Sequence, residues 1–292
     1  MTALAPLPAL TGQSPSLLLG LIGTGIQASR TPRMHEMEAA AQGLRCIYRL
    51  IDLDVLGVGL EALPDLVTAA QRFGFAGLNI THPCKQAVIP LLDELSSDAR
   101  ALGAVNTVVF RTGKRIGHNT DWSGFAESFR RDLHDARRER VVQFGAGGAG
   151  AAVAHALLTL GVAELTLIDT DASRAQRLAD ALCTRFGDRC AVTRRDVPAA
   201  IAAADGVVNT TPLGTAAHPG MAFPPELLRG DLWVADIVYF PLETELLREA
   251  RGRGCRTMAG SGMALFQAVD AFRLFTGREP DATRMRRAFE SA

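Results

Sequence analysis

The apolar positions along the chain follow two kinds of pattern, one typical of strands and one typical of helices. These patterns alternate along the chain, which predicts an α/β fold. Short apolar runs of strand length recur between longer segments whose apolar residues return every three or four positions, as on one face of a helix. From residue 141 onward the alternation is regular, which is typical of βαβ units and a parallel sheet. The strands predicted in this part are 141–144, 165–169, 190–193, 206–210, 232–238 and 256–259.

The first part of the chain predicts a second α/β unit. Thr31-Pro32 marks a helix start, because threonine is a good N-cap and proline suits the first helical position. We expect a hairpin across Arg111-Thr112-Gly113 and a helix over 86–95. The other predicted elements outside 141–259 are strands at 17–22, 46–53 and 75–81 and helices at 31–42, 63–73, 121–133, 263–275 and 283–289.

Length and charge narrow the class of protein. A chain of 292 residues is long enough for two domains. We place the boundary between them at the helix predicted over 121–133, which leads into a charged linker, 134–140. Lysine plus arginine and aspartate plus glutamate both number 31, so no net charge draws the chain to nucleic acid or to an anionic membrane. No apolar stretch reaches the ~20 residues that span a bilayer.

The cysteines argue against a metal site. The five of them form no C-x-x-C pair, and no histidine joins them at metal-ligand spacing. An odd, scattered set fits reduced thiols. We therefore expect a cytoplasmic monomer or homodimer without a metal, whose partner is a small molecule rather than nucleic acid or a membrane.

The glycine-rich segment 145–150 carries the clearest chemical signal. It lies between the apolar run 141–144 and a predicted helix over 151–160, and Asp169 follows Gly150 by nineteen residues at the end of the next strand. Glycines at a strand-to-helix turn let main-chain N–H groups approach a pyrophosphate, and the carboxylate suits a ribose 2′-hydroxyl. This pattern predicts NAD before NADP. The alternative is a tight turn followed by an ordinary acidic cap.

Hydride transfer to or from a nicotinamide also requires a group that moves a proton, and two residues of this chain are candidates for it. Lys85 follows a predicted strand end, where α/β sheets place ligand sites, and Asp121 opens a predicted helix. Together they could hold one substrate hydroxyl and exchange its proton. Taken singly, each is more often a surface ion, and Asp121 could simply cap its helix.

Ser29 and Thr31 stand just before a predicted helix, where two hydroxyl groups make a suitable cradle for a carboxylate. The alternative is that Thr31 caps the helix and Ser29 merely lies in the loop. The residues alone leave both interpretations open.

With these motifs in their order, the chain resembles the shikimate/quinate dehydrogenase family, closest to its NAD-dependent quinate/shikimate branch. The resemblance covers roughly residues 17 to 290. The motifs that carry it are 20–23, 29–32 with His35, 79–85, 103–107, 119–121, 145–150, 209–214, 236–239, and Gly260 with Gln267.

The resemblance implies a two-domain α/β fold with an irregular N-terminal segment, 1–16. A substrate-binding and catalytic domain, 17–121, is rejoined by C-terminal helices, 264–292, and a Rossmann-type NAD domain with a parallel sheet spans 122–263. The implied activity is reversible hydride transfer between NAD and a ring hydroxyl of quinate or shikimate.

The resemblance also implies a role for each site residue. Lys85 and Asp121 would form the catalytic pair. The implied substrate-binding residues are Ser29 and Thr31 for the carboxylate, Thr81, Asn106 and Gln267 for the ring hydroxyls, and Tyr239. The implied cofactor-binding residues are Gly145, Ala146, Gly147, Gly148 and Ala149 at the pyrophosphate, Asp169 and Arg174 at the adenosine, and Ile237 and Gly260 near the nicotinamide.

Two departures from the family pattern bear on specificity. Members that use NADP typically carry Asn-Arg-Ser/Thr where this chain has Asp169-Thr170-Asp171, so NADP is possible but disfavoured. Thr31 replaces a common serine, as in relatives that accept quinate besides shikimate. An aminoshikimate or aminoquinate dehydrogenase, and a catalytically silent dinucleotide sensor, stay open as alternatives.

Overall fold

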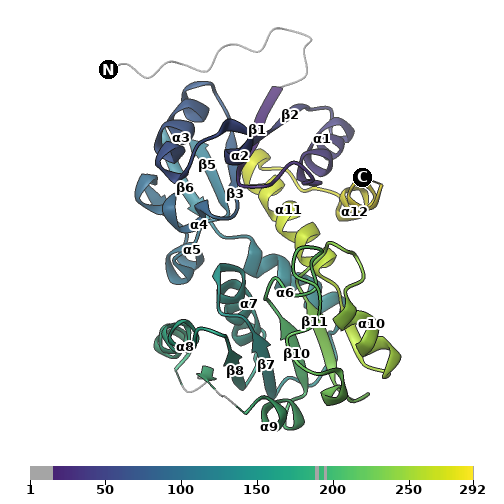
Figure 1. Cartoon of the computed structure of the whole chain (residues 1–292). Coiled ribbons are helices and arrows are strands. Elements are labelled where there is room, and N and C mark those ends of the chain that lie inside the picture. Colours follow the sequence, from purple (N-terminus) through teal and green to yellow (C-terminus); the bar gives the residue numbers. More distant parts are fainter. Residues whose placement is uncertain (1–15, 188–190, 194–195, 292) are drawn as a thin grey trace.

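The computed structural model of the chain describes residues 16–187, 191–193 and 196–291 (Figure 1). They form two α/β units, one above the other in Figure 1, each built on a six-stranded sheet. Of the segment 1–16, predicted to be irregular, only Ser16 is described, and it opens the first strand. Cys190, the predicted start of another strand, lies outside the described residues. No helix among those described is long and apolar enough to cross a membrane.

The N-terminal sheet is mixed, with the strand order β2-β1-β3-β5-β6-β4. β1 pairs in parallel with β2 and β3, whereas β5 runs antiparallel to both of its neighbours. The predicted hairpin is confirmed: Thr112 and Gly113 turn with φ of 51° and 80°, as a two-residue hairpin loop requires. The strands are β1 (Ser16–Gly23), β2 (Arg45–Asp52), β3 (Gly77–Ile80), β4 (Glu94–Leu95), β5 (Thr107–Arg111) and β6 (Lys114–His118).

Helices cover both faces of this sheet. One face packs apolar residues such as Leu78 and Val108 against α3, and the other packs Leu19 against Phe275 of α11 (Gly260–Thr276). α1 and α12 (Ala282–Glu290) lie beside α11 (Figure 1). The remaining helices of this part are α1 (Thr31–Ala41), α2 (Leu53–Leu56), α3 (Leu63–Arg72), α4 (Cys84–Ala87), α5 (Ser97–Leu102) and the 3-10 helices η1 (Leu60–Ala62) and η2 (Ile89–Leu91).

The helix predicted over 86–95 is wrong. This segment holds the end of α4, then η2, then the short strand β4. Val88 is buried and Leu91, Leu92 and Leu95 are half-buried at helical spacing, but Pro90 has no N–H to donate and its ring crowds the preceding turn. The proline therefore breaks the segment, and the short helix α5 that follows was not predicted.

The second sheet is entirely parallel, with the order β12-β11-β10-β7-β8-β9. Successive residues of β7 face opposite sides: Val141 packs with α6, α7 and α8, and Val142 packs with α9 and α10. Its strands are β7 (Arg140–Phe144), β8 (Glu164–Ile168), β9 (Ala191–Thr193), β10 (Gly206–Asn209), β11 (Trp233–Asp236) and β12 (Arg256–Met258). Its helices are α6 (Asp121–Asp132), α7 (Gly148–Thr159), α8 (Ala172–Phe186), α9 (Val197–Ala202), α10 (Glu245–Gly252) and the 3-10 helix η3 (Pro225–Leu227).

The strand order of this sheet reverses between β7 and β10, which is the point where open α/β sheets bind ligands. α6 and α11 pack together and connect the two sheets (Figure 1). The residue ranges assigned to each domain stay a prediction. Two of their limits, 121/122 and 263/264, fall at the start of α6 and within α11.

Candidate active site

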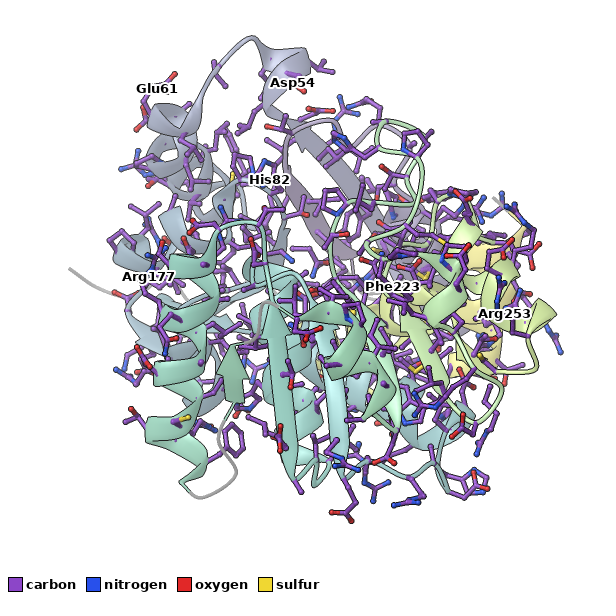
Figure 2. The ribbon with its side chains drawn as sticks, turned by 60° about the horizontal axis from the view of Figure 1, so that its bottom comes forward. Asp54, Glu61, His82, Arg177, Phe223 and Arg253 are labelled. Atoms are coloured by element: carbon purple, nitrogen blue, oxygen red, sulfur yellow. The ribbon has the colours of Figure 1, made fainter. Side chains whose placement is uncertain are left out.

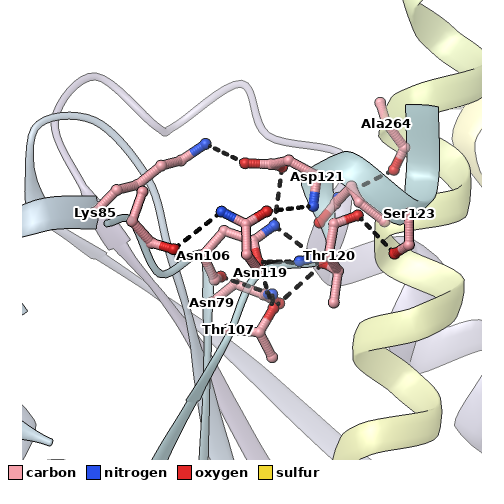
Figure 3. Close-up of polar contacts among 11 residues, drawn as sticks. Asn79, Lys85, Asn106, Thr107, Asn119, Thr120, Asp121, Ser123 and Ala264 are labelled. Atoms are coloured by element: carbon pink, nitrogen blue, oxygen red, sulfur yellow. Dashed lines mark hydrogen bonds and ion pairs between the residues drawn. The ribbon is translucent and has the colours of Figure 1, made fainter. Parts of the chain in front are cut away.

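Lys85 and Asp121 form an ion pair, with 2.7 Å between Nζ and Oδ2 (Figure 3). Lys85 lies on α4, after β3, and Asp121 is the first residue of α6, after β6. β3 and β6 are both antiparallel to β5, so their carboxyl ends meet at one edge of the sheet. The two side chains are 22% and 10% exposed.

The interpretation of Asp121 as a helix cap is wrong. Thr120 holds the N-cap position, and Asp121 is the first helical residue. Both carboxylate oxygens are held by side chains instead, Oδ2 by Lys85 and Oδ1 by Asn106 Nδ2 at 2.9 Å. The main-chain N–H of Thr120 donates to Asn106 Oδ1 at 2.7 Å, which fixes the amide from its other end. The carboxylate plane is therefore set before any ligand arrives.

The prediction that Thr31 caps α1 is also wrong. Arg30 is the N-cap residue, and Thr31 is the first helical residue. Pro32 has no N–H that needs a cap, and Ser29 Oγ accepts the N–H of Thr31 at 3.3 Å, so the helix begins one residue early. Among the described residues nothing bonds to the Thr31 hydroxyl, which leaves it available to a ligand.

A cavity of about 390 Å³ lies between the two sheets. It brings together Ser29 and Thr31 from the start of the chain and Gln267 from near its end. The predicted residues that line it are Ser29, Thr31, Thr81, Lys85, Asn106, Asp121, Ala149, Ile237, Tyr239, Gly260 and Gln267. Every residue predicted for substrate binding or catalysis therefore borders one space.

Other lining residues received no role from the sequence, among them Asn79 and Phe240. Asn79 lies on β3, two positions before Thr81, and the strand period of two places both on one face, so the pattern could have found it. Phe240 follows β11 and has no comparable sequence signal.

The glycine-rich turn joins β7 to α7. Gly145 has φ of +97°, and a Cβ there would lie 2.7 Å from Thr210 Oγ1, so this position shapes the turn. Gly147 and Gly148 differ, because a Cβ on either would meet nothing within 4 Å. With the N–H groups of α7 beside it, this open face fits a diphosphate.

Gly147, Gly148 and Ala149 line a second cavity, of about 810 Å³, whereas Gly145 lines neither cavity. Arg174 and Arg177 of α8 lie along it, and so do residues of the N-terminal half such as His82; Figure 2 labels His82 and Arg177. Arg177 was not predicted, although it is one helical turn from Arg174. The two cavities share Thr81, Lys85 and Ala149.

Asp169 holds the glycine-rich turn against the end of β8. Its Oδ2 accepts the N–H of Ala146 at 2.7 Å and its Oδ1 that of Asp171 at 2.8 Å. Oδ1 also accepts the Thr170 hydroxyl at 3.4 Å, whereas Oδ2 keeps a second acceptor position, which suits a ribose hydroxyl. Arg174 reaches Asp169 and Asp171 at 3.7 and 3.6 Å, so its charge is already countered.

A buried carboxylate supports the segment 237–239, which lines the first cavity. Asp236 accepts hydrogen bonds from Asn209 Nδ2, the Val238 N–H and Thr244 Oγ1, at 2.9, 3.0 and 2.7 Å. Burial raises the pKa of this carboxyl above its ordinary value, while the three donors oppose the rise. Among the described residues no cluster of histidine, cysteine, aspartate or glutamate is placed to hold a metal ion.

Comparison with known proteins agrees with this geometry. The profile of the shikimate dehydrogenase substrate binding domain matches residues 21–108, and that of the shikimate 5′-dehydrogenase C-terminal domain matches residues 260–288. A shikimate dehydrogenase (NADP(+)) of Streptomyces avermitilis is 63% identical over 92% of this chain and 94% of its own. The chain belongs to the shikimate dehydrogenase family.

Within the shikimate dehydrogenase family, relatives differ in the cofactor that their names carry. A quinate/shikimate dehydrogenase (NAD(+)) of Corynebacterium glutamicum is 55% identical over 94% of this chain and 99% of its own. The solved quinate dehydrogenase from Corynebacterium glutamicum in complex with NAD superposes with a TM-score of 0.90, at 55% identity, over 96% of this chain and 100% of that one. The predicted fold class and family are confirmed.

Proposed function

We propose that this protein is an NAD-dependent dehydrogenase that transfers a hydride between NAD and a ring hydroxyl of quinate or shikimate. The observation that carries the proposal is the position of the Lys85–Asp121 ion pair. Both residues line the first cavity, together with Ser29 and Thr31, and Lys85 also lines the second cavity, which borders the glycine-rich turn. A proton-transferring group therefore stands where an acid-binding space meets a dinucleotide-binding space.

The substrate carboxylate is placed by the start of α1. Ser29 and Thr31 supply hydroxyl donors, and the N-terminus of this helix favours a negative charge. Thr81, Asn106 and Gln267 then bind ring hydroxyls. Gln267 Nε2 donates to the Ala264 carbonyl at 3.0 Å, which turns its amide and leaves Oε1 as an acceptor.

Lys85 transfers the proton in this proposal. When bound, the dinucleotide accepts or supplies the hydride. In the reduction direction the Lys85 ammonium of the ion pair gives a proton to the carbonyl oxygen as the hydroxyl forms, and the oxidation direction reverses this step, with the hydroxyl proton passing to the Lys85 amino group. Asp121 holds the amino group at 2.7 Å, and Asn106 keeps the carboxylate in place.

The preference for NAD over NADP follows from charge. A 2′-phosphate at the end of β8 would meet Asp169 and Asp171, while Arg174 is already paired with both. One unfavourable charge pair at ~4 Å costs about 4 kcal/mol at an effective dielectric near 20. If screening leaves about a quarter of this, the preference is about fivefold.

The test is a two-by-two assay of quinate or shikimate against NAD or NADP, extended to the amino analogues. We expect turnover of quinate or shikimate, with a higher kcat/KM for NAD than for NADP. A higher kcat/KM for an amino analogue would reassign the substrate, and tight NAD binding without turnover of any acid would indicate a sensor.

A variant that inverts the charge at β8 tests the cofactor separately. Asp171 accepts the N–H groups of Ser173 and Arg174 and caps α8, so it is best kept. Asp169→Asn with Thr170→Arg should lower the NAD/NADP ratio of kcat/KM at least about tenfold. Thr184→Arg, which adds the same charge at the far end of α8, is the matched control. An unchanged ratio in the double variant would contradict the role of Asp169.

A further inference from the structure

A chain of buried side-chain hydrogen bonds runs behind the first cavity. Tyr48 Oη, on β2, donates to Asn79 Oδ1 at 2.7 Å, and Asn79 Nδ2 donates to Thr107 Oγ1 at 3.1 Å. Thr107 Oγ1 donates to Asn106 Oδ1 at 3.1 Å, and Asn106 Nδ2 donates to Asp121 Oδ1 at 2.9 Å. Figure 3 shows this chain from Asn79 to Asp121.

The two amides of the chain each have a single orientation. The carboxylate of Asp121 only accepts and the N–H of Thr120 only donates, so the amide of Asn106 has a single orientation. At the other end, Asn79 Nδ2 also faces the Asn106 carbonyl at 3.3 Å, which turns Asn79 Oδ1 toward Tyr48. The phenol is therefore the donor that starts the chain.

Tyr48 itself does not touch either cavity. It is 6% exposed, and its ring packs against His35 with 5.1 Å between ring centroids. Burial raises the pKa of this phenol well above its ordinary value, so the hydroxyl stays protonated and donates throughout the pH range of an enzyme assay. Asn79, in contrast, lines the first cavity and has an acceptor position left on Oδ1.

We propose that Tyr48 is a positioning residue for the reaction: its hydroxyl locks the amide of Asn79 and, through Thr107 and Asn106, the carboxylate of Asp121. This proposal rests on the proposed function. Without the phenol, Asn79 Oδ1 loses the one donor that it has among the described residues, and the amide can turn, which exchanges an acceptor for a donor at the cavity wall. The effect is then on binding of a substrate hydroxyl and on the placement of Asp121, not on the cofactor.

A double-mutant cycle between Tyr48→Phe and Asn79→Ala tests this route. Tyr48→Phe removes one oxygen and should lower kcat/KM for the acid about tenfold, since a buried amide oxygen is left without its donor. The KM for NAD should stay within about twofold, because the second cavity is not touched. In the Asn79→Ala background the same change should lower kcat/KM less than about twofold further, because both variants remove one connection.

Equal losses in both backgrounds would overturn the proposal, since the phenol would then act through general packing. No loss in the wild-type background would also overturn it. Ser128→Ala is the matched control, because it removes a buried hydroxyl from α6 outside the chain, and it should leave kcat/KM unchanged.

A second measurement needs no turnover and so separates this proposal from the proposed function. Hydrogen exchange of the Asn79 and Asn106 side-chain amides, followed by NMR, should accelerate at least about tenfold in Tyr48→Phe as their hydrogen bonds loosen. Unchanged protection would overturn the role of Tyr48 even if quinate or shikimate is turned over. Accelerated exchange in a protein that turns over neither acid would support the chain of hydrogen bonds and reject the substrate.

Discussion

The two halves of the candidate site are built by different means. In the N-terminal half, side chains hold side chains: Lys85, Asp121 and Asn106 are fixed by mutual hydrogen bonds in a largely buried cluster. In the C-terminal half, the part of the second cavity that the glycine-rich turn forms is main chain, with Gly147 and Gly148 facing open space. Proton transfer needs a group at one point, whereas a diphosphate needs room and N–H donors.

This difference predicts that substitutions in the two halves have separable effects. The largest is expected for Lys85→Met, which should lower kcat by about 10²- to 10⁴-fold, because it removes the proton-transferring group. The Kd of NAD, measured by fluorescence titration, should change less than about threefold, since main-chain groups bind the diphosphate.

The chain has one other lysine, Lys114, which pairs with Glu94 on the surface. Lys114→Met is therefore the matched control and should keep kcat within about twofold. A loss of NAD affinity as large as the loss of kcat in Lys85→Met would show that the halves are not separable at this residue.

The complementary change in the C-terminal half is Gly147→Ala. Its Cβ meets nothing in the free protein, so the free energy of unfolding in urea should change by less than about 0.5 kcal/mol. The KM for NAD should rise about tenfold, because the methyl group stands where the diphosphate approaches, while kcat/KM for the acid at saturating NAD stays near wild type.

Gly145→Ala is its counterpart within the same turn. Here φ is +97° and the Cβ would approach Thr210, so the loss should appear as about 1–3 kcal/mol of stability. A loss of stability in Gly147→Ala as large as that in Gly145→Ala would contradict the statement that the turn is open at Gly147.

A third prediction concerns acid. Burial lowers the pKa of His35 to about 3, and neither ring nitrogen has a partner among the described residues. Below pH 6.5 the unfolded chain binds a proton that the folded protein does not, so stability is highest above pH 6.5 and falls as the pH drops toward 3. From pH 7.5 to 5 this one group should cost about 2 kcal/mol.

Urea titrations at the two pH values measure this loss. His35→Phe should remove about 2 kcal/mol of the difference and leave the part due to His155, whose pKa burial lowers to about 4. A substitution of the exposed His218, His218→Gln, should keep the whole difference. An unchanged pH dependence in His35→Phe would show that other groups set acid stability.

The smallest effect on catalysis is expected at Arg30, where the N-terminal half of the site contacts the C-terminal half. The Arg30 guanidinium lies over the rings of Phe240 and Phe289, at 4.7 and 5.2 Å from their centroids, and Nη1 donates to the Phe289 carbonyl at 2.7 Å. Arg30→Met should raise the KM for the acid about threefold through the loosened Phe240 wall. Arg33→Met, one helical turn on and exposed, should not change it.

Local pattern was enough for much of the fold. Short apolar runs predicted the strands of both sheets except β4, and Thr112-Gly113 marked the hairpin. Pattern failed where one residue overrules its neighbours: Pro90 broke a segment whose apolar spacing was helical, and Pro32 moved the start of α1.

The candidate site was harder to predict from the sequence than the fold, because its residues are far apart in the chain and come together only in the folded protein. From the sequence, Lys85 and Asp121 taken singly were each more often a surface ion or a helix cap, and it was the family resemblance that implied their role as the catalytic pair. Tyr48 and Asn79 meet across β1, which pairs with both of their strands, and no local signal couples positions 31 residues apart.

The three residues common to both cavities, Thr81, Lys85 and Ala149, have a consequence for inhibitor design. A compound that joins a carboxylated ring to a flat heteroaromatic group would pass directly beside the Lys85 amino group. When the two groups bind as separate molecules, each loses its translational freedom, whereas the joined compound loses it only once. The joined compound should therefore bind far more tightly than either group alone.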